Sequence, residues 1–130
     1  MEGAHKKSTG TLMSLSEQNL MDCVHPYEDG CNGGAMLDAF DYVVENGIMS
    51  EADYPYMAKD SGYGVCNYIN DQVVATMRTY KSIIPYQDEE QLMQALAMVG
   101  PISIGIDASQ VSFQLYHDGV YSEPSCSSTK

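Results

Sequence analysis

The chain has 130 residues, 44 % of them hydrophobic, and a formal net charge of −12 that arises from 18 acidic and 6 basic residues. This composition is typical of a globular chain that forms one ordinary domain or a part of a larger one. The negative charge disfavours binding to nucleic-acid phosphates and to anionic membrane surfaces, because both require patches of Lys and Arg.

The first helix signal follows an exposed end. Residues 1–10 carry basic side chains and no helix cap, so we expect them to lie on the surface. Ser14 and Glu17 stand at the S-x-x-E spacing, in which each side chain bonds the other's backbone amide. This spacing predicts a helix that continues to about Cys23 and ends before Pro26.

A glycine-rich corner precedes the second helix. The run Gly30-Cys31-Asn32-Gly33-Gly34 places three glycines within five positions, which requires a tight turn or a close approach by another group. Apolar residues at positions 35, 36, 39, 40, 43 and 44 then follow helical spacing. Asn46-Gly47 supplies a C-terminal stop, and residues 50–64 are expected to form a loop.

The second half combines a helix with predicted strands. Residues 73–80 are rich in β-branched and aromatic side chains, which indicates a strand. Acidic residues at positions 88–90 favour the start of a helix that continues to Val99. Residues 101–107 alternate isoleucine with small or polar residues, which predicts a half-buried strand, and residues 119–121 predict another. Gly and Pro interrupt the longest apolar stretch, residues 95–106, so neither a membrane span nor a signal peptide is expected.

Four cysteines, Cys23, Cys31, Cys66 and Cys126, contain no C-x-x-C pair. Their even number favours disulfides over a zinc site or a thioredoxin-like motif. Disulfides indicate a secreted, lumenal or lysosomal compartment. No metal and no cofactor is expected, since the histidines lack partners at the spacing of metal ligands.

Several motifs together resemble a known family. They are Ser14-Leu15-Ser16-Glu17-Gln18-Asn19-Leu20-Met21-Asp22-Cys23, Gly30-Cys31-Asn32-Gly33-Gly34, Tyr54-Pro55-Tyr56, Gly100-Pro101-Ile102-Ser103 and Gly119-Val120-Tyr121. In this order they resemble the papain-like cysteine proteases, and among these the cathepsin L, K and S branch. The resemblance implies an α+β fold with two domains and an inter-domain cleft, here truncated. Residues 1–83 would form the mainly helical domain without its N-terminal part, and residues 84–130 an incomplete β-rich domain.

The resemblance also implies that the catalytic residues lie outside the chain. The family's nucleophile stands in a C-G-[SA]-C-[WY] signature, and no such signature occurs here. Glu2-Gly3-Ala4 resembles the helix that follows the nucleophile, and Ser125-Cys126-Ser127 the segment before the catalytic histidine. The catalytic Cys, His, Asn and oxyanion Gln would all be missing. We therefore expect a fragment of a cathepsin-like endopeptidase that is inactive alone.

The resemblance assigns substrate contacts and disulfides residue by residue. Gly33 and Gly34 would offer backbone groups to an extended substrate. Met36 and Gly105 would line the apolar pocket for the residue second from the scissile bond, with Gly105 widening it. Asp29 and Ala35 would form the neighbouring pocket, where Ala35 replaces a common aromatic residue. Cys23 would pair with Cys66, whereas Cys31 and Cys126 would each pair with a cysteine outside the chain.

Simpler interpretations stand beside these assignments. Without the family, Gly33 and Gly34 would be turn glycines and Met36 a core residue, while His117 reads as a surface histidine. The rival function is a non-catalytic binding or regulatory module that retains half of the cleft. For the full-length parent, the resemblance implies a peptide or protein substrate, a propeptide and cystatin-type inhibitors as partners, and a lysosomal or extracellular location.

Overall fold

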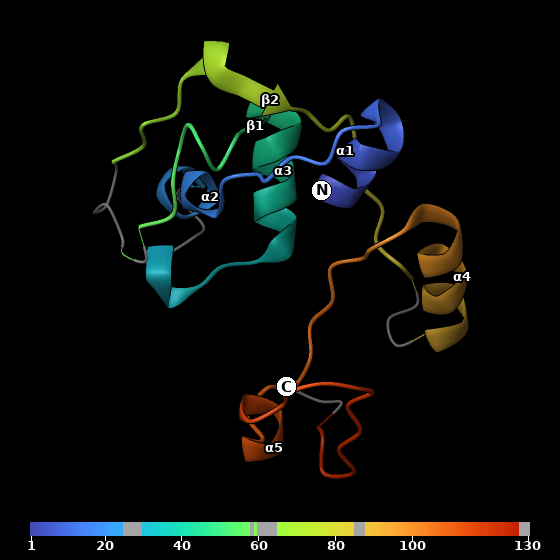
Figure 1. Cartoon of the computed structure of the whole chain (residues 1–130). Helices are drawn as coiled ribbons and strands as arrows, with labels where there is room; N and C mark the ends of the chain where they lie inside the picture. The colour runs from blue at the N-terminus through green and yellow to red at the C-terminus, as the bar shows by residue number, and fades with distance from the viewer. Residues whose placement is uncertain (25–29, 58, 60–64, 85–87, 128–130) are drawn as a thin grey trace.

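A computed structural model describes residues 1–24, 30–57, 59, 65–84 and 88–127 (Figure 1). Its elements in chain order are α1 (Glu2–Thr9), α2 (Glu17–Cys23), the 3₁₀ turn η1 (Gly30–Asn32), α3 (Met36–Asn46), β1 (Ile48–Met49), the 3₁₀ turn η2 (Asn70–Gln72), β2 (Val73–Ala75), α4 (Glu89–Val99) and α5 (Val111–Gln114). The two strands pair antiparallel, with Ile48 opposite Ala75. Figure 1 shows α1, α2, α3 and the sheet in one larger part, α4 beside it, and α5 in a smaller lobe near the C-terminus.

A small apolar core joins α3 to the sheet. Leu15, Val43, Ile48 and Ala75 are all less than 9 % exposed and pack together. Leu15 lies in the segment before α2, which runs antiparallel to the residues after β1: the Ser16 amide donates to the Met49 carbonyl at 3.0 Å. The core therefore depends on segments far apart in the sequence.

Helix α2 begins at a different serine from the one predicted. Ser16 is its N-cap, and the Ser16 hydroxyl accepts a hydrogen bond from the Asn19 amide at 2.9 Å. The Ser14 carbonyl instead accepts from the Glu51 amide at 3.0 Å. The prediction of Ser14 as the cap was wrong because this tertiary pairing draws Ser14 into extended backbone. The helix still extends to Cys23, as predicted, and Pro26 lies outside the described residues.

The other two predicted helices are confirmed. Helix α3 ends at Gly47, whose φ is 81° and whose amide donates to the Val43 carbonyl at 2.9 Å. A Cβ on Gly47 would lie 2.6 Å from Val73 Cγ1, so only glycine lets β2 pack here. Helix α4 begins after Asp88, whose carboxylate accepts from the Gln91 amide at 2.9 Å.

The predicted strands form only in part. Of residues 73–80, the structure forms a strand at Val73–Ala75 alone. Residues 101–107 and 119–121 are irregular, so those two strand predictions were wrong for this chain. A strand requires a hydrogen-bonding neighbour, and among the described residues only β1 and β2 pair as named strands. Ile104 and Ile106 accordingly remain 59 % and 47 % exposed.

Residues 1–10 lie at the surface without a side-chain helix cap, as expected, and they form α1, which the local sequence did not predict. This helix agrees with what the resemblance implies for Glu2-Gly3-Ala4. Helix α5 was not predicted. Within the described ranges no helix has the length and apolarity needed to cross a bilayer.

Candidate functional site

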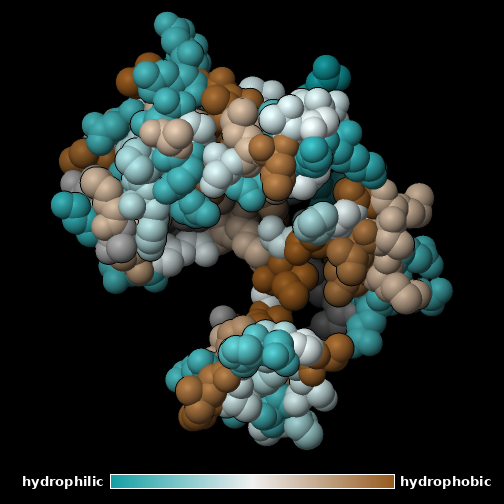
Figure 2. Space-filling model, in the orientation of Figure 1, coloured by the Kyte–Doolittle hydropathy of each residue, from teal (hydrophilic) through white to brown (hydrophobic). Residues whose placement is uncertain are grey.

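A cavity of about 480 Å³ lies between helices α3 and α4 and two irregular segments. The segments are residues 80–83 and residues 102–106, so its walls come from both halves of the chain. Side chains that line it include Met36, Leu37, Phe40, Ile83, Leu92, Ile102, Ile104 and Ile106. Figure 2 shows hydrophobic residues in brown facing the hollow between the larger part and the smaller lobe.

Met36 and Gly105 both line this cavity, the first from α3 and the second from the segment 102–106. Met36 is the first residue of α3 and is 46 % exposed, which suits a cavity wall better than a core position. Gly105 lies in the extended segment, and no described atom lies within 4 Å of where its Cβ would stand. The cavity is therefore open beside Gly105.

The residues of the glycine corner lie outside the cavity lining. Gly33, Gly34 and Ala35 are exposed and connect η1 to α3. Gly33 has a φ of 112°, and a Cβ there would meet no described atom within 4 Å. Backbone conformation, not lack of space, therefore requires glycine at this position. Asp29 lies outside the described residues.

A second cavity of about 550 Å³ runs along α3 toward the start of α1. It shares Met36, Phe40 and Ser103 with the first cavity. Met1, Leu15 and Pro101 also contribute to its lining. Phe40 is a wall residue that was not predicted, although its position one helical turn after Met36 places the two side chains on one face of α3.

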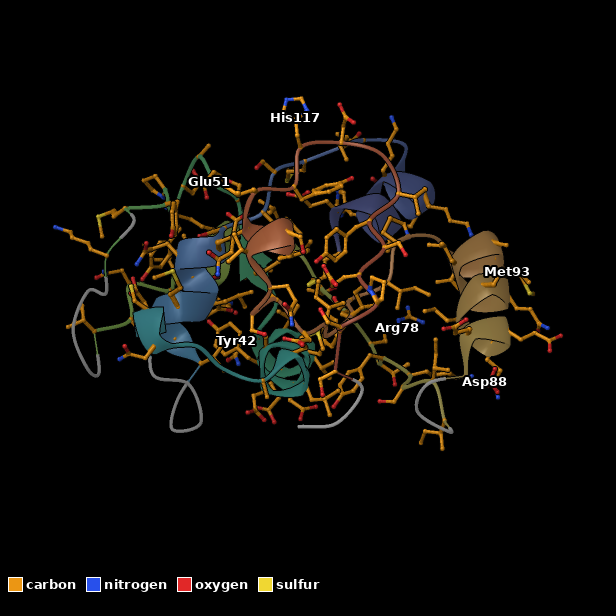
Figure 3. All side chains as sticks on the ribbon, turned by 90° about the horizontal axis from the view of Figure 1, so that it is seen from below. Tyr42, Glu51, Arg78, Asp88, Met93 and His117 are labelled. Atoms are coloured by element: carbon orange, nitrogen blue, oxygen red, sulfur yellow. A yellow bond between two sulfur atoms is a disulfide. The ribbon has the colours of Figure 1, made fainter. Side chains whose placement is uncertain are left out.

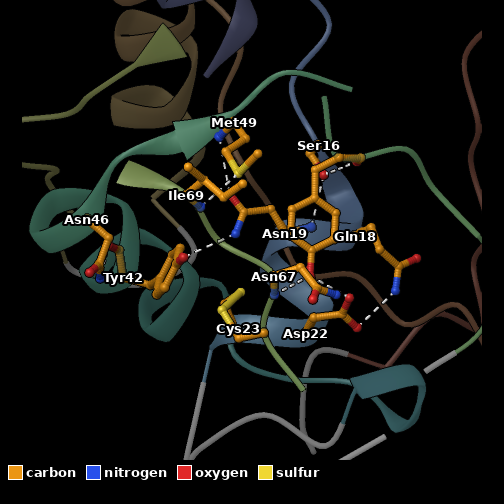
Figure 4. Close-up of a disulfide and its surroundings, with 12 residues drawn as sticks. Ser16, Gln18, Asn19, Asp22, Cys23, Tyr42, Asn46, Met49, Asn67 and Ile69 are labelled. Carbon is orange, nitrogen blue, oxygen red and sulfur yellow. Dashed lines mark hydrogen bonds between the residues drawn. A yellow bond between two sulfur atoms is a disulfide. The ribbon is translucent and has the colours of Figure 1, made fainter. Parts of the chain in front are cut away.

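Buried polar side chains on α2 bond the irregular segment that includes Tyr54 and Met57, and Figure 4 shows the labelled members of this polar group beside the disulfide. The Asp22 carboxylate is 1 % exposed and accepts from the Tyr54 hydroxyl at 2.8 Å and from the Gln18 amide at 2.9 Å. Gln18 also accepts from the Met57 amide at 3.0 Å. Burial raises the pKa of the Tyr54 hydroxyl, and Asp22 adds to that shift. These bonds fix the irregular backbone near Tyr54 and Met57, which lies in no helix or strand.

The structure contains the disulfide between Cys23 and Cys66 that the resemblance implied. It joins the end of α2 to the segment before η2, across 43 positions of sequence. Cys31 and Cys126 are free and exposed. Their pairing with cysteines elsewhere stays a prediction.

Surface hydrogen bonds organise the lobe that contains α5. Asp107 accepts from the Ser109 hydroxyl at 2.6 Å and from the Ser127 amide at 3.0 Å. These donors lower the pKa of Asp107 to about 2. Glu123 similarly accepts from the Ser112 and Ser125 hydroxyls, which lower its pKa. Each of the two carboxylates accepts hydrogen bonds from the serine two positions later in the chain and so stabilises a turn.

The predicted surface histidine lies outside the lining of the cavity. His117 lies at the periphery of the molecule, as predicted, and its side chain is 93 % exposed beside Asp118 (Figure 3). Within the described residues, no group of three or more His, Cys, Asp or Glu side chains is arranged to hold a metal ion. The site consists of an open apolar cavity with exposed backbone near one end of α3.

Comparison with known proteins gives consistent matches along the whole chain. The model of the papain family of cysteine proteases matches residues 1–130. The chain is 52 % identical over 130 residues to a cathepsin L-like peptidase of Aedes aegypti and 48 % identical over 130 residues to human cathepsin L2. These matches cover 98 % of this chain but 37 % and 38 % of those proteins.

A solved structure agrees with the sequence matches. Digestive procathepsin L 3 from the larval midgut of Tenebrio molitor superposes with a TM-score of 0.87 at 40 % identity. That superposition covers 97 % of this chain and 40 % of the other. The chain thus spans well under half the length of the relatives it matches, and its fold is the one found in that part of them.

Proposed function

Because the chain belongs to the papain family of cysteine proteases, we propose that it supplies one part of the substrate cleft of a cathepsin-like endopeptidase. The observation that carries this proposal is the cavity that Met36 and Gly105 both line. An open apolar cavity between two parts of a chain is a common form of ligand site. Here it would receive the side chain of the residue second from the scissile bond.

The exposed corner beside the cavity would bind the substrate backbone. Gly33 and Gly34 are exposed immediately before α3, so an extended peptide would reach their backbone groups and pair as an added strand. Ala35 would leave the neighbouring pocket without a large hydrophobic wall, and Asp29 would stand near it. Gly105 would make the main pocket slightly wider than an alanine would.

We further propose that this polypeptide does not cleave peptides by itself. Peptide hydrolysis of this kind requires a thiolate that a neighbouring imidazole activates, with donors for the oxyanion. The nucleophile signature does not occur in the sequence, and Cys23 and Cys66 are consumed in a disulfide. In the complete enzyme, Cys31 and Cys126 would pair with cysteines from other parts of the chain, and residues 1–83 and 84–130 would belong to its two domains.

The partners and location of the complete protein follow from the family. Two of the similar proteins, from rat and mouse, are named procathepsin L, which supports a propeptide as one partner. Protein substrates and cystatin-type inhibitors would be the others. The complete protein would act in lysosomes or outside the cell, where the Cys23–Cys66 disulfide is stable.

Two measurements on the purified chain test this proposal. A fluorogenic dipeptide with Leu or Phe second from the cut should not be hydrolysed. A labelled peptide with Leu at that position should bind by fluorescence anisotropy, and Met36→Glu should weaken binding about 10-fold or more, because a charge replaces an apolar contact.

Met93→Glu is the matched control, since Met93 is 64 % exposed on the outer side of α4 (Figure 3) and does not line the cavity. It should leave the affinity unchanged. Hydrolysis that a thiol reagent stops would refute the inactivity of the chain. Equal loss of binding in both variants would refute the assignment of the cavity.

A further inference from the structure

Helix α4 lacks a cation of its own at its C-terminal end. Its first turn and cap carry Asp88, Glu89 and Glu90, but its last turn contains no basic residue. The final carbonyls of a helix have no intrahelical donors and carry the negative end of the helix dipole. A cation from elsewhere in the molecule would therefore stabilise this end.

Lys7 of α1 is placed to supply that cation. Its ammonium donates to the Met98 carbonyl at 2.9 Å and reaches the Val99 carbonyl at 3.5 Å, across 91 and 92 positions of sequence. Gly3 lies one turn earlier on the same face of α1. A Cβ on Gly3 would stand 3.3 Å from Pro101 Cγ, so α1 also packs closely on the second residue after α4.

We propose that Lys7 is a positioning residue that holds α4 against α1 and thereby sets the width of the cavity. The cavity has one wall on α3 and another on α4 and residues 102–106. A separate hydrogen bond, from the Tyr80 hydroxyl to Asp41 at 2.8 Å, joins the irregular segment 80–83 to α3 and does not involve α4. The Lys7 contact joins the C-terminal end of α4 to α1. The link to substrate binding rests on the proposed function, whereas the contact itself does not.

Lys6 provides a matched control within the same helix. Its ammonium donates to the Gly10 carbonyl, four residues away at the end of its own helix. Lys6 and Lys7 have the same charge and are both exposed. Replacing either one changes the net charge equally, but only replacement of Lys7 removes the contact with α4.

Spin labels on α3 and α4 measure the proposed effect directly. The starting protein carries Cys31→Ser and Cys126→Ser, which remove the free thiols, and Glu45→Cys and Gln94→Cys, which place one label on each helix. Lys7→Met should widen the label-to-label distance distribution and raise the population of detached conformations about 2- to 5-fold, the range expected for one cation at a helix C-terminus. Lys7→Arg should restore the original distribution, and Lys6→Met should not alter it.

Peptide anisotropy on the same variants separates this inference from the proposed function. Lys7→Met should weaken peptide binding by a similar factor while the circular dichroism stays unchanged. Identical distance distributions for Lys7→Met and Lys6→Met, or no recovery with Lys7→Arg, would overturn the inference even if peptide binds. A distance change in a chain that binds no peptide would instead leave the positioning role intact and refute the proposed function.

Discussion

Two regions of the molecule contrast in how they are held together. In the first region, residues 1–84, the described part contains all of the hydrophobic residues that are buried, together with the sheet and the disulfide. In the second region, residues 88–127, Val120 is 98 % exposed and Leu115 and Met98 are each 77 % exposed. Both regions carry regular apolar patterns, so the difference shows that burial depends on an available partner surface and not on the pattern alone.

The two regions also differ in where their polar side chains form hydrogen bonds. The buried side chains of Ser16, Gln18 and Asn19 accept hydrogen bonds from backbone amides, and such bonds contribute about 0.5–1.5 kcal/mol each. In the second region, Asp107 and Glu123 make their bonds at the surface, where water competes. The first region should therefore unfold cooperatively, whereas the second should loosen more readily.

The largest expected effect comes from removing the disulfide of the first region. The double substitution Cys23→Ser and Cys66→Ser should lower the free energy of unfolding by about 2–4 kcal/mol, because the unfolded chain gains conformational freedom. Urea unfolding followed by circular dichroism measures this change. The control Cys31→Ser alters an exposed, free cysteine and should have little effect. Equal midpoints for both proteins would contradict the proposed role of the bond.

The same Val→Ala substitution in each region compares how much a valine contributes to the free energy of unfolding. Val43 is 1 % exposed and Val120 is 98 % exposed. Val43→Ala should destabilise the chain by about 2 kcal/mol, because it removes buried methyl groups and leaves a cavity. Val120→Ala should stay within about 0.5 kcal/mol. Similar losses for both, measured by urea unfolding, would show that the second region buries Val120 in solution.

The smallest effect concerns the response of the second region to pH. The folded pKa of Asp107 is lowered to about 2, so its stabilising contribution is present above the unfolded value, near 3.9, and is lost as the pH falls through about 2. The Ser109 and Ser127 amide resonances in NMR spectra should shift across that window. Asp107→Asn should abolish the shift. A transition near pH 4 in the native chain would mean that the turn bonds are absent.

The sequence by itself determined helices α2, α3 and α4 and the family. Caps, helical periodicity and stop glycines act between residues within a few positions of each other, so Asp88 and Gly47 could be interpreted without a fold. The motifs that identify the family are likewise short runs. The resemblance based on these runs implied the pairing of Cys23 with Cys66, and the structure confirms it.

Only the tertiary structure decided the features that need a distant partner. Residues 101–107 have the alternation of a strand but no strand beside them among the described residues. Ser16 replaced Ser14 as the cap because Ser14 pairs with Glu51. The cavity between α3 and α4 and the contact of Lys7 with α4 likewise join residues far apart in the sequence. Local patterns specify how a segment bends, whereas pairing, burial and cavity walls depend on which surfaces the chain brings together.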